Sequence, residues 1–261
     1  WDGAYRLSKG IVPYSDFGIP LGPVSFYLPA FFFKLFGPSW LTLQLSQLII
    51  NILLIYVVWG ILKQLTSKKY ELYLGLIFFN FCYVILLTHP WYNITAILFF
   101  LLSIQLTLYQ KSYFTFFAGF TCALTIFTKQ DYALMTIISV FCITYFLEKD
   151  KNNNNFLFVP NNMSAIVGKL RSKYFLFLIL GLTLGILFFF SIYDLSQMSY
   201  WFNYGQYPHT LRKPNLLNSI LYPQIYLSLF CLWLAFRNKD LSLFIAFLIL
   251  LTSGFCNQTS G

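Results

Sequence analysis

The sequence has little charge. Only 10% of its 261 residues are Asp, Glu, Lys or Arg, whereas an ordinary soluble domain has about 25%. Eight acidic and 17 basic residues are too few to cover the surface of a water-soluble fold of this length, so we exclude that class. The net charge of +9 is scattered between hydrophobic runs, which also excludes a disordered chain, a coiled coil and a nucleic-acid-binding module.

Two other features are missing from the sequence. The five cysteines lie in apolar stretches and form no CxxC pair, so we expect small buried packing residues, not disulfides or a zinc site. There is also no initiator Met before Trp1, and the chain ends straight after an apolar run. We therefore expect a fragment of a longer protein that lacks a first membrane helix and a C-terminal part.

What the sequence has in abundance is apolar and aromatic side chains, at 58% and 21% of the residues. A helix needs about 20 mostly apolar residues to cross the roughly 30 Å hydrocarbon layer of a bilayer. Runs of this kind predict about eight transmembrane helices, near residues 41–62, 72–88, 92–109, 112–128, 131–147, 174–193, 217–236 and 241–256. The expected fold is therefore an all-α integral membrane protein, a polytopic helix bundle.

The basic residues orient this bundle, because cytoplasmic loops carry more Lys and Arg. Counting alternate loops puts eleven on one side: Lys63, Lys68, Lys69, Lys111, Lys149, Lys151, Lys169, Arg171, Lys173, Arg237 and Lys239. Six fall on the other: Arg6, Lys9, Lys34, Lys129, Arg212 and Lys213. We expect the richer side to be cytoplasmic, which places residues 1–40 and the loop around 194–216 outside. The Asn-rich segment 148–173 predicts a flexible inner connector.

Residues 1–40 differ from the rest, since charged residues alternate there with Gly and Pro. We expect an ordered extracytoplasmic loop with two juxtamembrane helices, one over Gly3 to Gly10 and one over Val24 to Phe36 that ends at Gly37-Pro38. Residues 1–40 then form a catalytic loop, and residues 41–261 form the transmembrane bundle.

The motifs of this loop resemble the first outer loop of polytopic type C (GT-C) glycosyltransferases. They are Asp2-Gly3-Ala4-Tyr5, Lys9-Gly10-Ile11-Val12-Pro13-Tyr14-Ser15-Asp16-Phe17, Gly22-Pro23-Val24-Ser25-Phe26-Tyr27-Leu28-Pro29-Ala30 and Lys34-Leu35-Phe36-Gly37. The closest group looks like the protein O-mannosyltransferase-related enzymes, which include bacterial lipid A glycosyltransferases. Gly22-Pro23-Val24 departs from the family's more usual Pro-Pro-Leu. The later Lys129-Gln130 is similar to the family's Lys-Gln pair at an outer helix end.

The resemblance implies transfer of a sugar from a polyprenyl-phosphate donor, with Asp2 as the catalytic base. The chemistry agrees, since a sugar phosphate already carries a good leaving group and needs only a base for the acceptor hydroxyl and cations for the phosphate. Direct attack would invert the anomeric carbon. The alternative is that Asp2 only caps the helix that follows it.

Asp16 has two interpretations, a second catalytic carboxylate that orients the acceptor or, with Asp2, holds a divalent cation, and a residue that fixes the Pro13 to Phe17 turn. Tyr14 of the same turn is a candidate substrate-binding residue. No other cofactor is expected.

Further substrate-binding candidates are mostly cations. Lys129, with Gln130 and Asp131 beside it, could reach the donor phosphate, or its ammonium could extend to the membrane interface. Arg212 and Lys213 could bind the same phosphate, or be ordinary surface cations. His89 lies in a tight outer turn, where it could be a base, a metal ligand or a plain turn residue.

The expected function is therefore an inverting membrane glycosyltransferase that acts on an extracytoplasmic glycan, lipid or protein. Short loops and the lack of a retention signal favour a bacterial plasma membrane. The partners are the polyprenyl-phosphate donor, the acceptor and the bilayer, with no nucleic acid. The alternatives are a transporter or flippase of a lipid-linked envelope precursor, which should bury its charges mid-membrane, and a noncatalytic scaffold.

Overall fold

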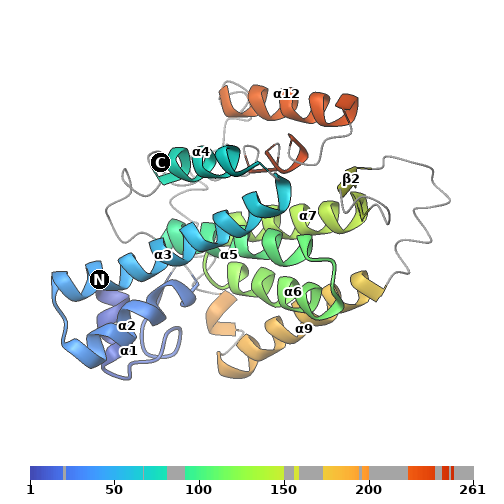
Figure 1. Ribbon diagram of the computed structural model, residues 1–261. Coiled ribbons are helices and arrows are strands. Elements are labelled where there is room, and N and C mark those ends of the chain that lie inside the picture. Colours follow the sequence, from blue (N-terminus) through green and yellow to red (C-terminus); the bar gives the residue numbers. More distant parts are fainter. Residues whose placement is uncertain are drawn as a thin grey trace.

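The computed structural model describes residues 1–19, 22–66, 68–80, 92–149, 156–158, 173–193, 196–199, 223–238, 243–246 and 248–249. Most of them are helical (Figure 1). The helices are α1 (Asp2–Ser8), α2 (Val24–Phe36), α3 (Trp40–Leu65), α4 (Lys69–Phe79), α5 (Tyr92–Leu108), α6 (Ser112–Ile126), α7 (Gln130–Phe146), α9 (Lys173–Ile192) and α12 (Pro223–Asn238). The predicted all-α character is confirmed, apart from one small ribbon.

That ribbon consists of two three-residue strands, β1 (Leu147–Lys149) and β2 (Phe156–Phe158), which pair antiparallel with Leu147 opposite Phe158. All of it except Leu147 lies within the segment 148–173 that we predicted to be a flexible connector. The prediction is therefore wrong at both ends of the Asn run, while residues 150–155 lie outside the described part.

Two helices of the described residues are long and apolar enough to cross a membrane, judged by length and composition. They are α3, with 26 residues, and α9, with 20. Helices α5, α6 and α7 coincide with predicted spans but contain 15 to 17 residues each. The predicted range 241–256 lies mostly outside the described residues.

Among the described elements, helices α6 and α9 form the most extensive contact. A Cβ added to Gly181 would lie 1.9 Å from the carbonyl oxygen of Phe116, and one added to Gly119 would lie 2.1 Å from that of Leu178. Only glycine permits so close an approach of two backbones. Gly181 and Gly185 are one helical turn apart, the small-residue spacing that lets membrane helices pack closely.

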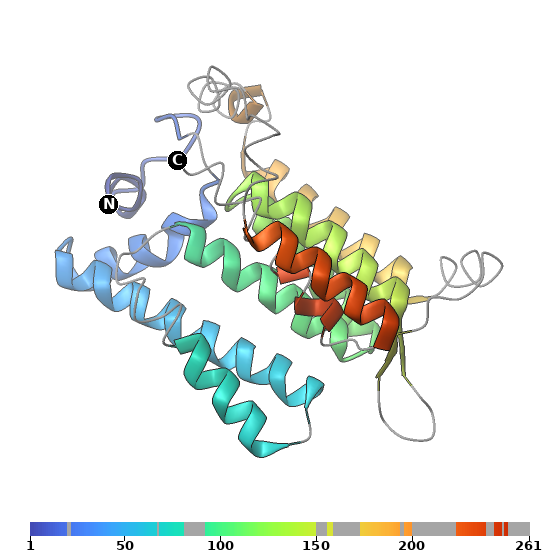
Figure 2. The same ribbon diagram turned by 90° about the horizontal axis from the view of Figure 1, so that it is seen from above.

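The contacts at the helix ends define two ends of the bundle. At one end, which we call the loop end, the ring of Phe127 after α6 stacks on Phe189 of α9 at 4.1 Å, and α1 and α2 lie nearby. At the opposite end, the ribbon end, Phe141 of α7 meets Phe175 of α9 at 5.3 Å, close to β1 and β2. Figure 2 shows this separation, with the dark-blue N-terminal segment and the olive strands at opposite corners.

Candidate functional site

The site at the loop end begins with Asp2, the first residue of α1. Trp1 is the N-cap residue, and no side-chain hydrogen bond caps the helix, so the capping alternative for Asp2 is wrong. Instead, Arg6 Nε donates a hydrogen bond to Asp2 Oδ2 at 2.9 Å, one helical turn away. The Asp2 side chain is 73% exposed, so its carboxylate is open to a substrate.

Helix α1 packs against the rest of the protein through the face that carries Gly3 and Ala4. Gly3 and Ala4 are buried there, and a Cβ on Gly3 would lie 3.2 Å from the ring of Phe26 in α2. Ala4 packs in a cluster with Phe33 of α2 and Leu43 of α3. The two predicted juxtamembrane helices are therefore confirmed as helices, and α1 presents Asp2 and Arg6 outward.

Asp16 stabilises the turn that follows α1. The backbone N–H of Val12 donates to Asp16 Oδ2 at 2.7 Å, and the N–H of Asp16 donates to the carbonyl of Val12 at 3.0 Å. These are the contacts of the turn interpretation, although the side chain is also exposed. Arg6 links this turn to α1, because its guanidinium lies 5.3 Å from the centre of the Phe17 ring.

Tyr14 lies inside the loop end. Its side chain is 1% exposed, and its ring meets that of Tyr193 edge-on at 5.4 Å. Burial, with a smaller contribution from Tyr27, raises the pKa of the Tyr14 phenol well above its ordinary value. Its φ of 70° is in the left-handed region that a non-glycine residue rarely adopts. Tyr14 thus packs against protein in this structure.

Residues 1–19 and 22–37, which we call the outer loop after the predicted topology, rest directly on the turn that carries Lys129. The N–H of Val24 donates to the carbonyl of Phe127 at 3.0 Å, and a Cβ on Gly22 would lie 1.9 Å from the same oxygen. The structure therefore brings together two parts of the chain that the sequence singled out separately, residues 1–37 and the Lys129-Gln130 pair.

Lys129 itself is 4% exposed, and its ammonium lies 5.3 Å from the centre of the Tyr132 ring. This burial contradicts the alternative in which the ammonium extends to the interface. Gln130 Nε2, at the start of α7, is buried without a hydrogen-bond partner among the described residues, and the same holds for Asn93 Oδ1 near the start of α5. Buried amide groups of this kind need an explanation, such as a bound ligand or water.

Three of the candidate residues, His89, Arg212 and Lys213, lie outside the described residues. Asp131 belongs to α7, but its side chain is not described. No group of three or more His, Cys, Asp or Glu side chains that could hold a metal ion occurs in the described ranges. A cation at Asp2 and Asp16 would thus receive no third such ligand from them.

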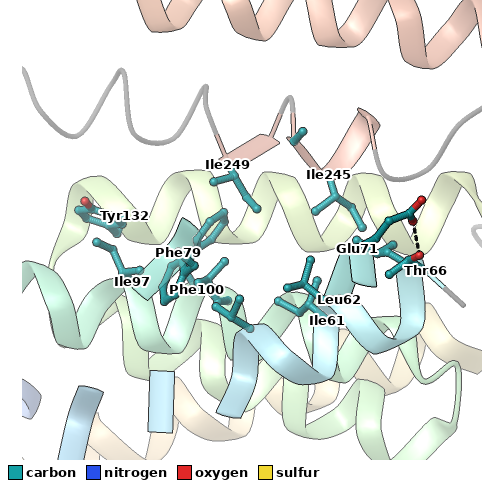
Figure 3. A pocket seen from close by; sticks show the side chains of 14 residues that line it. Ile61, Leu62, Thr66, Glu71, Phe79, Ile97, Phe100, Tyr132, Ile245 and Ile249 are labelled. Carbon is teal, nitrogen blue, oxygen red and sulfur yellow. Dashed lines mark hydrogen bonds between the residues drawn. The ribbon is translucent and has the colours of Figure 1, made fainter. Parts of the chain in front are cut away.

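An apolar cavity of about 440 Å³ lies between α3, α4, α5, α7 and the residues Ile245, Ala246 and Ile249 (Figure 3). Tyr132 and Ile97 line one end of it, and Thr66 and Glu71 line the other. Thr66 Oγ1 donates to Glu71 Oε2 at 2.5 Å, and Lys68 Nζ lies 3.2 Å from Glu71 Oε1. These hydrogen bonds lower the pKa of the Glu71 carboxyl. Sequence reasoning missed the cavity, because its walls come from five separate segments, the fifth being α7 with Tyr132.

A comparison of the chain with protein-family models, curated proteins and solved structures finds no match. Three features of the site bear on its chemistry. They are an exposed carboxylate on α1, a buried ammonium below the outer loop, and an apolar cavity whose wall residue Tyr132 contacts that ammonium.

Proposed function

We propose that this chain is the membrane-embedded part of a glycosyltransferase that moves a sugar from a polyprenyl phosphate to an extracytoplasmic acceptor. One observation carries the proposal. The loop that presents Asp2, the proposed base, is joined to the turn of Lys129, the proposed cation, by the contact of Gly22 and Val24 with Phe127.

The proposal includes eight membrane spans, with the loop end outside the cytoplasm of a bacterium. Helices α3 and α9 support it because they are long and apolar enough to cross a bilayer. The described cations support it because they fall into two groups at opposite ends of the bundle, as the predicted topology requires. Lys63, Lys68, Lys111 and Lys173 belong to the ribbon end, whereas Arg6, Lys9, Lys34 and Lys129 belong to the loop end. The described charges occur near helix ends, which favours a transferase over a transporter with charges at mid-membrane.

In the proposed reaction, the acceptor hydroxyl oxygen attacks the anomeric carbon from the face opposite the phosphate. The bond between that carbon and the phosphate oxygen breaks, and its electron pair leaves with the polyprenyl phosphate. Asp2 accepts the proton of the attacking hydroxyl, while Arg6 keeps the carboxylate oriented. The configuration of the sugar is inverted, since no covalent sugar intermediate forms.

The departing phosphate is stabilised by cations. We assign this role to Lys129, with the amide of Gln130 as a hydrogen-bond donor, and to Arg212 and Lys213 of the segment after α9. A developing phosphate charge is best stabilised by groups that are already in place in a dry site, and Lys129 is 4% exposed. The apolar cavity beside Tyr132 is suited to the hydrocarbon chain of the donor.

Substitution of the base tests the proposal in the full-length protein. Asp2→Asn should leave the folded protein intact but lower sugar transfer from a polyprenyl-phosphate sugar by at least about 100-fold, the usual contribution of a general base. Glu148→Gln, which changes an acid at the ribbon end, is the matched control and should keep its activity. Transfer by Asp2→Asn at the wild-type rate would refute the assignment of the base. Mass spectrometry of envelope glycans and lipids, with and without the intact gene, would identify the acceptor.

A further inference from the structure

Three tyrosines at the loop end are not used by the proposed reaction. The hydroxyl of Tyr27 in α2 hydrogen-bonds the hydroxyl of Tyr193, the first residue after α9, across 166 positions of sequence. The ring of Tyr14 packs edge-on against the ring of Tyr193. We refer to Tyr14, Tyr27 and Tyr193 as the tyrosine cluster.

The surroundings of the cluster hold Tyr14 in an unfavourable backbone conformation. A buried non-glycine residue with φ near 70° persists only where neighbouring groups over-determine its position. Those neighbours are Ile19, Phe127, Phe189, Tyr193 and Met198, all buried in one apolar cluster. Strain of this kind is characteristic of segments whose exact placement matters for function.

The cluster lies where three segments of the proposed site meet. Tyr14 belongs to the turn that Asp16 closes, and Phe127 begins the turn that carries Lys129. Tyr193 and Met198 belong to the segment that leads to Arg212 and Lys213 in the sequence. The hydroxyl pair links α2 directly to the end of α9, next to Phe127 of the Lys129 turn.

We propose that Tyr14, Tyr27 and Tyr193 are positioning residues, which set the spacing of the outer loop, the Lys129 turn and the end of α9. The inference rests on the proposed function. Small misplacements of reacting groups, of about 1 Å, can cost on the order of 100-fold in rate. Loss of the hydroxyl pair should therefore lower kcat and leave donor binding largely unchanged.

The test uses Tyr27→Phe, Tyr193→Phe and the double variant in the full-length protein, with Tyr56→Phe as the control. Tyr56 is 62% exposed on α3, away from the cluster. Each single variant should lower kcat about 10-fold with the donor KM within about 2-fold, because loss of one hydroxyl should displace the reacting groups by less than the roughly 1 Å that costs on the order of 100-fold. The double variant should be no worse than either single variant, because both changes remove the same hydrogen bond.

A second measurement does not depend on activity. Ser15 is exposed in the turn beside Tyr14, so a Ser15→Cys background can be labelled with a membrane-impermeant maleimide. Labelling should be several-fold faster in the Tyr27→Phe and Tyr193→Phe backgrounds, because the turn is held less firmly. If the wild type transfers no sugar, the proposed function is wrong, but the labelling rates still test whether the tyrosine cluster holds the turn in place.

Two results would overturn the inference. One is an unchanged kcat together with unchanged labelling in both single variants. The other is a fall in thermal stability alone, with kcat per folded molecule preserved, since this would make the cluster purely structural. If Tyr193→Phe gives no folded protein, Tyr27→Phe carries the same test, because its side chain is 41% exposed and tolerates the change more readily.

Discussion

Gly22 is the position at which a single added methyl group should separate the outer loop from the bundle. A Cβ there would lie 1.9 Å from the Phe127 carbonyl oxygen and 2.6 Å from the Thr128 nitrogen, all within backbone that cannot rotate away. Real Cβ contacts are not shorter than 3.0 Å, so Gly22→Ala must move the loop by about 1.1 Å. The Val24 to Phe127 hydrogen bond would break as a result.

The expected loss of stability is about 2 to 4 kcal/mol, from about 1 kcal/mol for the hydrogen bond and about 1 to 3 kcal/mol for overpacking. The loop that carries Asp2 would also move away from Lys129, so sugar transfer should fall on the order of 100-fold at a temperature where the variant remains folded. Thermal unfolding in detergent and transfer kinetics on the same preparation measure the two effects.

Gly10→Ala in the same loop is the matched control. Gly10 has a φ of 81°, but no atom lies within 4 Å of the position that a Cβ would take, so alanine adds strain of about 1 to 2 kcal/mol and no collision. This variant should lose stability and keep its transfer rate. Wild-type values for Gly22→Ala in both measurements, or an equal loss of transfer in Gly10→Ala, would show that the contact of Gly22 with Phe127 does not hold the loop in place.

Three further predictions concern other parts of the chain. Burial raises the pKa of the Tyr14 phenol in the folded protein, whereas the phenol of the unfolded chain ionises above about pH 10. The free energy of unfolding should therefore fall above about pH 10 by about 1.4 kcal/mol per pH unit. Denaturation measured between about pH 9 and 11 should show a shallower fall for Tyr14→Phe. Gly181→Val should lower the Tm, because its Cβ would lie 1.9 Å from the carbonyl oxygen of Phe116 in α6. The expected loss in the free energy of unfolding is at least about 1 to 3 kcal/mol. An impermeant maleimide should label Ser15→Cys from outside intact cells and Lys68→Cys only after permeabilisation; the opposite pattern would invert the topology.

Much of the helical structure could be predicted from the sequence, because apolar runs and their terminators are local signals. The predicted helix Val24 to Phe36 matches α2 residue for residue, and Gly37 with its φ of 82° ends it as expected. The predicted spans at 92–109 and 112–128 match α5 and α6 to within two residues. Tight connections of a few residues leave little freedom in these boundaries.

The site could be predicted only in part, because its contacts are long-range. Asp2 could be a cap or an ion-pair partner from its position alone, and the Arg6 four residues later was the signal for the second. Nothing local joins Tyr27 to Tyr193 or predicts that Lys129 is buried. The β1–β2 ribbon was missed because the polar Asn run outweighed the short apolar segments on either side of it.

The outer loop is connected to the α6–α9 pair through Phe127, which follows α6 and contacts both Val24 and Phe189. Any change that separates α6 from α9 should therefore disturb the position of the loop as well. Substitutions at Gly181 are expected to lower stability and transfer together. Tyr27→Phe leaves the α6–α9 contact intact and should lower transfer with little loss of stability. Comparison of the two variants therefore distinguishes contacts that stabilise the bundle from contacts that only position the reacting groups.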